Sequence, residues 1–122
     1  MIEKTVRMSL LFDFYGQLLT ERQREFFTLY YDNDLSLGEI ASQYGVSRQA
    51  VYDILRRSTH TLNELESKLE LVKHYEEQRS AYEAIERDLE SVEESLRGLP
   101  QTEDAIMRLA RVRKALSELW DA

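Results

Sequence analysis

The residues best suited to chemistry lie on one expected helix, at positions that could meet a nucleic acid. Ser47, Arg48, Gln49 and Tyr52 occupy its first turns and are expected to point away from its apolar side. An arginine can pair with guanine and a glutamine with adenine, each through two hydrogen bonds, and an aromatic ring can stack on a base. Phosphates would be held by further arginines: Arg56, Arg57, Arg22 and Arg24. The pattern predicts nucleic-acid binding.

The same surface has a second interpretation, as a solvated helix face. Asp53 lies on it and would repel phosphate. Asp53 also stands four residues before Arg57, which is the spacing of an ion pair on a helix. Tyr52 could then pack on a neighbouring helix instead of stacking on a base. Both interpretations stay open, because a fold that is used mainly to bind nucleic acid does not prove that function.

A helix-turn-helix over residues 37–57 is expected to position these side chains. Ala41 is small where two helices would cross closely, and Gly45 permits the tight turn between them. Apolar residues fill the wedge between the two helices: Val46, Val51 and Ile54. Small, flexible and apolar residues at these spacings predict that the second helix displays its first turn outward.

Capping residues predict where the helices begin. Thr20 and Ser36 each precede a Gln or Glu by three residues, which is the form of a capping box, and Ser47 is a further N-cap. The helix that follows Thr20 is expected to end near Asp32. An earlier amphipathic helix is expected over about Thr5 to Leu19. Its buried stripe would consist of Val6, Leu10, Phe14 and Leu18, widened by Leu11 and Tyr15.

The C-terminal half is expected to form a helical tail. The helix that begins at Arg48 follows a heptad rhythm with no strong stop, and we expect a break near His74. The rhythm resumes at Tyr82 and stops at a Gly and Pro turn near residue 98, after which Thr102 would cap a last helix. The last two helices should form an antiparallel hairpin.

These elements predict an all-α fold with a helix-turn-helix head on residues 1–58 and a tail on residues 59–122, made of a long helix plus the hairpin. The apolar seam of the tail could be the core of an intramolecular bundle or the interface of a dimer. The small head alone cannot bury so long a seam, so a homodimer is expected.

Composition excludes several classes of protein. The chain has 122 residues, no cysteine and a net charge of -7. Disulfides, thiolate zinc sites and cysteine nucleophiles are therefore excluded, and indiscriminate nucleic-acid binding is disfavoured. No run of apolar residues is long enough for a membrane span, and we expect neither a cofactor, a metal site nor catalysis. The two histidines, His60 and His74, would stand about 21 Å apart on one helix.

Two parts of the chain resemble known families. Residues 19–57 resemble region 4 of bacterial sigma factors, which reads promoter DNA. Residues 2–8, 11–15, 18–20 and 47–53 look like the YlxM family of small bacterial proteins. The resemblance implies a sigma region 4-like, winged-helix-like head.

The YlxM resemblance implies a cytoplasmic regulatory protein associated with the signal recognition particle pathway. Its partners would be nucleic acid, DNA or RNA, and components of that particle. The alternative is an adaptor whose head binds a protein, such as the GTPase of the particle, without touching nucleic acid. Arg48, Gln49, Tyr52 and Asp53 belong to the shared signature. Tyr52 and Asp53 depart from the sigma pattern, which favours RNA or protein as the target over promoter DNA.

Overall fold

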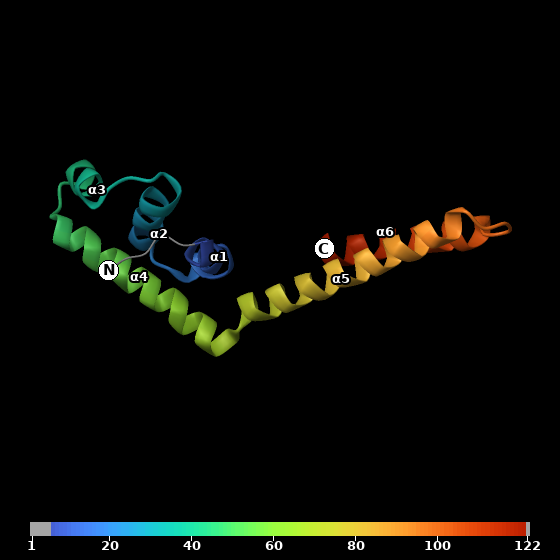
Figure 1. Ribbon diagram of the computed structural model, residues 1–122. Helices are drawn as coiled ribbons and strands as arrows, with labels where there is room; N and C mark the ends of the chain where they lie inside the picture. The colour runs from blue at the N-terminus through green and yellow to red at the C-terminus, as the bar shows by residue number, and fades with distance from the viewer. Residues whose placement is uncertain (1–5, 122) are drawn as a thin grey trace. The chain divides into compact units, whose positions relative to one another are not determined.

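The computed structural model describes residues 6–121, which form six α-helices and no β-strand. In chain order they are α1 (Val6–Tyr15), a 3-10 turn (Gly16–Leu18), α2 (Glu21–Phe27), a π-helical turn (Thr28–Asp32), α3 (Leu37–Tyr44), α4 (Arg48–Leu69), α5 (Leu71–Arg97) and α6 (Glu103–Asp121), as Figure 1 shows. The expected all-α fold is confirmed. The winged-helix-like description was wrong for this part of the chain, since a wing requires strands.

Caps set the helix boundaries of the N-terminal unit. The hydroxyls of Thr20 and Ser36 accept the backbone N–H groups three residues later, and both capping boxes are complete. The helix after Thr20 continues through the π-helical turn to Asp32, as expected. Gly45 adopts the left-handed conformation at φ 66° and ends α3. Ser47 then accepts a hydrogen bond of 3.0 Å from the Ala50 N–H and starts α4.

The buried face of α1 differs from the expected one. The core takes Leu11, Tyr15 and Leu19, whereas Val6 is 87% and Leu18 is 64% exposed. Leu11, Tyr15 and Leu19 pack with residues from α2, α4 and α5: Phe27, Leu62 and Val72. The expected apolar stripe and the observed one lie one residue apart along this segment. The periodicity of the sequence alone therefore could not show which of the two is buried. The expected start of this helix at Thr5 lies outside the described residues.

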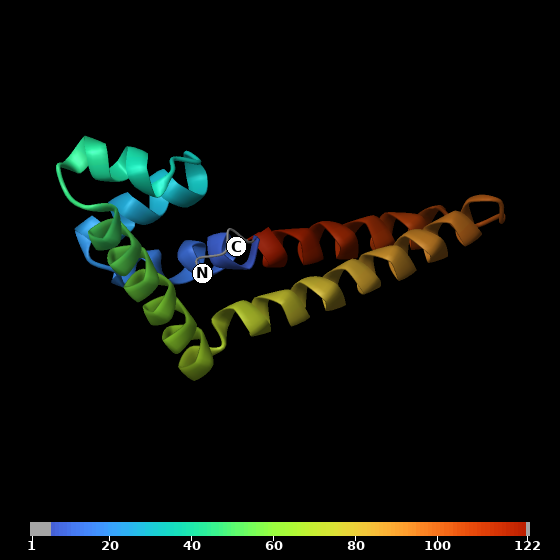
Figure 2. The same ribbon diagram turned by 60° about the vertical axis from the view of Figure 1, so that its left-hand side comes forward.

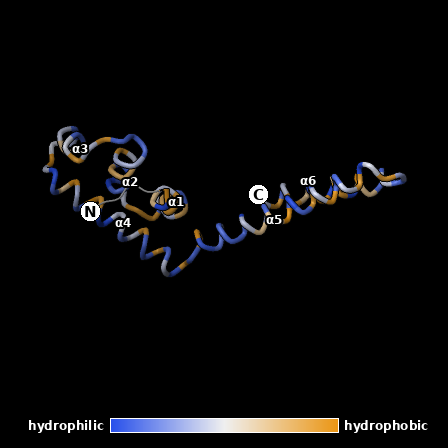
Figure 3. Tube along the Cα trace, viewed as in Figure 1, coloured by the Kyte–Doolittle hydropathy of each residue, from blue (hydrophilic) through white to orange (hydrophobic). Residues whose placement is uncertain are grey.

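Helix α4 is the central element of the N-terminal unit, because it packs against α1, α2 and α3. Val51 and Leu55 join a core cluster with Phe26, Ile40 and Ala41, and Leu62 joins the cluster around Tyr15. Ser58 lies buried between the two clusters, where its hydroxyl donates to the Ile54 carbonyl at 2.8 Å. Apolar and hydrophilic segments alternate along α4 in Figure 3, as one buried face requires.

The long helix breaks at Glu70, so the expectation of a break near His74 was wrong. Glu70 has φ 52°, a left-handed conformation that ends α4, and α5 begins at the next residue. A buried carboxylate fixes this corner. Glu66 Oε1 accepts from the Tyr15 hydroxyl at 2.5 Å and from the Val72 N–H at 3.1 Å, and its Oε2 accepts from the Lys73 N–H at 3.0 Å. Glu66 therefore caps the N-terminus of α5.

The chain divides into compact units after Lys73, not after residue 58. The reason is that α4 runs through residue 58 without interruption and buries Leu62 and Glu66 beyond it. Residues 59–73 thus belong to the same unit as the helix-turn-helix.

The second unit, from His74 onward, is an antiparallel hairpin, as expected. Its two helices, the rest of α5 and α6, lie side by side in both views of Figures 1 and 2. The Thr102 hydroxyl at the turn donates to the carbonyls of Leu96 and Leu99, each at 2.9 Å. At the other end, the Trp120 ring stacks on Tyr75 and Tyr82, with centroids 5.3 and 5.5 Å apart.

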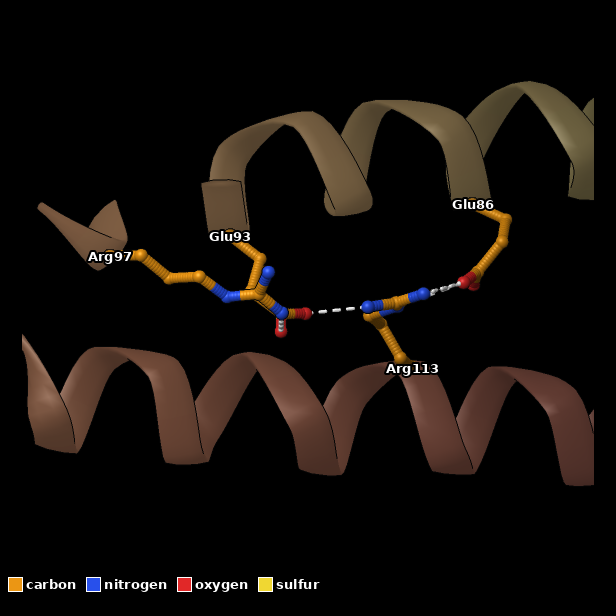
Figure 4. A network of polar contacts seen from close by, with 4 residues as sticks. All are labelled: Glu86, Glu93, Arg97 and Arg113. Atoms are coloured by element: carbon orange, nitrogen blue, oxygen red, sulfur yellow. Dashed lines mark hydrogen bonds and ion pairs between the residues drawn. The ribbon is translucent and has the colours of Figure 1, made fainter. Parts of the chain in front are cut away.

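An ion-pair network lies in the middle of the hairpin seam (Figure 4). Arg113 on α6 reaches two carboxylates of α5, Glu86 and Glu93, the second at 2.5 Å. Arg97 pairs with Glu93 at 2.7 Å. Hydrogen bonds from Arg97 and Arg113 hold the pKa of the Glu93 carboxyl below its usual range. Charge-assisted contacts of one arginine with two carboxylates of the facing helix favour one alignment of the two helices.

Across residues 6–121, no helix combines the length and the apolar character that crossing a bilayer would require.

Candidate nucleic-acid interface

The helix-turn-helix is formed by α3, the turn at Gly45 and α4. The N–H groups of Gly45 and Val46 both donate to the Ala41 carbonyl, which closes the end of α3. Ala41 is buried at the crossing of the two helices. The expected steric pattern is therefore present, and the outer side of α4 begins with an exposed first turn.

The structure brings three predicted contact residues together at the start of α4. Arg48 and Gln49 are exposed and Tyr52 is half-buried. Together with Leu37, the first residue of α3, they line a hollow of about 300 Å³. Ser47 is exposed beside them, although its hydroxyl oxygen already accepts the Ala50 N–H.

Arg56 and Arg57 lie further along α4 and are exposed. They line a second hollow of about 640 Å³, whose other lining residues are all polar: Gln23, Thr59, His60, Thr61 and Asn63. Sequence reasoning weighed His60 only as a metal ligand and missed its place here. The signal that could have found it is its spacing of four residues from Arg56, which puts both on one face of a helix.

Asp53 is engaged by Gln49 and not by Arg57. The Gln49 side-chain amide donates to Asp53 Oδ1 at 3.0 Å. Within residues 6–121, the ion pair between Asp53 and Arg57 that a purely solvated face would favour is not formed. Nor do Arg48 and Arg56 make an ion pair with any residue of that range.

Arg22 and Arg24 are held by the protein itself. The Arg24 guanidinium donates to the carbonyls of Leu19 and Gln17, at 3.0 and 3.4 Å. The Arg22 guanidinium lies 5.3 Å from the ring centre of Phe26 and 5.1 Å from that of Tyr44. These contacts use only part of each guanidinium, which has five N–H donors, so the predicted phosphate contacts of Arg22 and Arg24 stay a prediction.

The part of the chain that the structure describes contains no group of three His, Asp or Glu side chains able to hold a metal ion. The glutamates of α5 are mostly solvent-exposed, and Glu86 and Glu93 are taken up by Arg113.

Comparison with known proteins agrees with this geometry. A family model, UPF0122, described as "Putative helix-turn-helix protein, YlxM / p13 like", matches residues 2–100. A UPF0122 protein of Shouchella clausii (strain KSM-K16) is 52% identical over 91 residues, covering 75% of this chain and 84% of the relative. UPF0122 proteins of Bacillus mycoides (strain KBAB4) and Bacillus thuringiensis (strain Al Hakam) are 45% and 44% identical over 109 residues, covering 89% of this chain and 99% of each relative.

Proposed function

This chain belongs to the UPF0122 family of YlxM / p13-like helix-turn-helix proteins, and from that premise we propose that it is a regulatory protein of the cytoplasm that binds nucleic acid through α4. In this proposal it catalyses no reaction of its own.

One observation carries the proposal: among the residues that the structure describes, three arginines on the outer side of α4 have no carboxylate partner. In a chain of net charge -7, carboxylates are abundant. On the hairpin, Arg79, Arg97 and Arg108 each pair with a Glu or Asp of their own helix, whereas Arg87 and Arg111 form no ion pair within residues 6–121. The arginines of α4 make no such pair within residues 6–121. Unpaired cations gathered on one helix suit an anionic ligand such as a phosphate backbone.

The positions of these side chains suggest separate roles. Arg48 and Gln49 in the first turn would meet base edges in a major groove, which is the part of a recognition helix that enters it. Arg56 and Arg57 stand eight and nine residues beyond Arg48, or about 12 to 14 Å along the helix axis. At that distance they would contact phosphates at the rim of the groove and fix the register.

The proposal predicts salt-sensitive binding. Two to three phosphate contacts should make the affinity fall about 20-fold between about 50 and about 200 mM salt, because bound cations are displaced from the phosphates on binding. Fluorescence anisotropy with a labelled DNA duplex and, separately, a labelled RNA duplex measures this dependence. Failure to bind either polymer, or binding that salt does not change, would contradict the proposal.

A protein adaptor is the second candidate, and Asp53 favours it, because a carboxylate on the same surface opposes phosphate. The YlxM resemblance adds the signal recognition particle pathway to both candidates, with an RNA or a GTPase as partner. Purification of the protein with its partners from cells, before and after nuclease treatment, separates the two. A partner lost on digestion would support the nucleic-acid function, and one retained would support the adaptor.

We also propose that the hairpin joins two copies of the chain. Ile85, Val92 and Leu99 recur every seven residues along α5 and its end, and Val112 and Leu119 do so on α6. Four of them, Ile85, Val92, Val112 and Leu119, lie one residue before a half-buried seam position, and this equal offset puts both rows on one side of an antiparallel pair. All five are exposed, from 45% at Ile85 to 76% at Leu119. A second hairpin laid on this side would cover both rows and give a four-helix bundle.

The dimer predicts a concentration-dependent mass. Sedimentation equilibrium should give twice the chain mass of 14.4 kDa at micromolar concentration. The double variant Val92→Glu, Val112→Glu should be monomeric, because it buries two carboxylates in the interface. Arg87→Glu makes the same change in net charge outside the apolar rows and should stay dimeric. A monomeric wild type at high micromolar concentration would refute the dimer.

A further inference from the structure

The hollow at the start of α4 has apolar walls although it opens on a polar surface. Two of its lining residues are apolar or aromatic: Leu37, in the first turn of α3, and Tyr52, one turn into α4. Arg48 and Gln49 complete its lining. The space of about 300 Å³ would admit a small apolar group. On the major-groove edges of base pairs, the apolar group on offer is the C5-methyl of thymine, which makes apolar contacts with protein side chains.

Gln49 is fixed beside this hollow in a way that suits adenine. One hydrogen of its side-chain amide is donated to Asp53, at 3.0 Å. The second hydrogen and the carbonyl oxygen remain available, and these are the donor and acceptor that meet N7 and the 6-amino group of adenine. Asp53 therefore acts on this surface as a positioning residue for Gln49.

The Arg48 side chain runs along α3 next to Gly38. A Cβ atom at Gly38 would stand 3.8 Å from both Cδ and Nε of Arg48, so the guanidinium stem passes close to the first turn of α3. Arg48 thus lies against the first turn of α3 and also lines the hollow.

From this arrangement we infer that the hollow receives the C5-methyl group of a thymine that neighbours the adenine read by Gln49. The protein then distinguishes thymine from uracil, and so duplex DNA from RNA. The inference rests on the proposed function, since it requires α4 to enter a major groove.

Two synthetic duplexes that differ only in this methyl group test the inference: alternating poly(dA-dT) and alternating poly(dA-dU). Burial of one methyl group should make the full-length protein bind the thymine duplex about fourfold more tightly. Tyr52→Ala removes one wall and should bring the ratio close to one, whereas Tyr52→Phe keeps the wall and the ratio. Arg56→Ala is the matched control: it should weaken binding to both duplexes and leave their ratio unchanged.

The outcomes separate the inference from the proposed function. Equal binding of the wild type to both duplexes, or a ratio that Tyr52→Ala leaves unchanged, overturns the methyl site and leaves nucleic-acid binding standing. Binding to a duplex RNA of alternating A and U that is tighter than binding to the thymine duplex overturns the methyl site as well. No binding to any of the duplexes overturns the inference and the proposed function together. Circular dichroism of the Tyr52 variants establishes that they are folded.

Discussion

Replacing Glu66 by alanine is expected to lower the free energy of unfolding of the N-terminal unit by about 3 kcal/mol. The carboxylate is 7% exposed and accepts three hydrogen bonds, from the Tyr15 hydroxyl and the N–H groups of Val72 and Lys73. Alanine would leave a buried phenol and the first turn of α5 without their acceptor. Chemical denaturation followed by far-UV circular dichroism measures the change, and amide exchange at Val72 and Lys73 should accelerate in the same variant.

Two variants bracket this effect. Glu64→Ala removes a carboxylate of the same helix whose partner is the exposed Lys68, at 3.8 Å, and should change stability by less than about 0.5 kcal/mol. Tyr15→Phe removes one of the three hydrogen bonds to Glu66 and should lower the free energy of unfolding by about 1 kcal/mol. If Glu66→Ala proved as mild as Glu64→Ala, the carboxylate would have no part in fixing the corner between α4 and α5.

Because of the same carboxylate, the free energy of unfolding is expected to depend on pH. Burial alone would raise the pKa of Glu66, but hydrogen bonds from Tyr15, Val72 and Lys73 outweigh it and hold the pKa below its usual range. A lowered pKa in the folded state means that the unfolded chain binds the proton more readily. The contribution of Glu66 is therefore complete above the unfolded pKa of about 4.3 and is lost as pH falls through the folded value. Glu66→Gln should remove this part of the pH dependence.

Glu66 also shows where prediction from sequence reaches its limit. The helix starts at Thr20, Ser36 and Ser47 were predictable because each depends on a side chain three residues from its partner. The end of α3 was predictable because Gly45 takes a conformation that other residues avoid. Glu66, in contrast, is a charged residue in a charged segment, and only its approach to Tyr15, fifty-one residues earlier, makes it a buried cap.

The break in the long helix could not be predicted for a related reason. Glu70 takes a positive φ, which is uncommon for a residue other than glycine, and no Gly or Pro marks the position. Leu69 and Val72 continue the apolar rhythm across it, so the pattern extended the helix towards His74. Glu66 accepts the N–H groups of Val72 and Lys73 at this corner, and its contact with Tyr15, which buries it there, is tertiary.

The residues of the candidate site also fall into two groups, those that the local sequence determines and those that tertiary contacts determine. Arg48, Gln49 and Tyr52 were predictable as one group because the helix-turn-helix pattern fixes both the start and the outward face of α4. Leu37 is half-buried in the first turn of α3, and its place in the lining of the hollow depends on how α3 crosses α4. Whether an arginine has partners within the protein depends on its neighbours in space, and for this reason Arg24, which donates to two carbonyls, could not be told apart from Arg56.

The largest effect on binding is expected from the triple variant Arg48→Ala, Arg56→Ala, Arg57→Ala. Each arginine that contacts a phosphate or a base contributes roughly tenfold to affinity near 0.1 M salt, so the variant should bind a DNA duplex roughly 10²- to 10³-fold more weakly. Its affinity should also depend less steeply on salt, by about two units in the logarithmic slope, because two phosphate contacts are lost. Anisotropy titrations of the wild type and the variant over a range of salt concentrations measure both quantities.

The triple variant also makes the protein more acidic, and general repulsion from the duplex has to be separated from the loss of contacts. Arg79→Ala, Arg87→Ala, Arg108→Ala on the hairpin makes the same change in net charge and leaves α4 intact. Repulsion that depends only on total charge would weaken both triple variants equally. Specific contacts would weaken the α4 variant alone. Equal losses would therefore reject α4 as the binding surface, even if the wild type binds DNA.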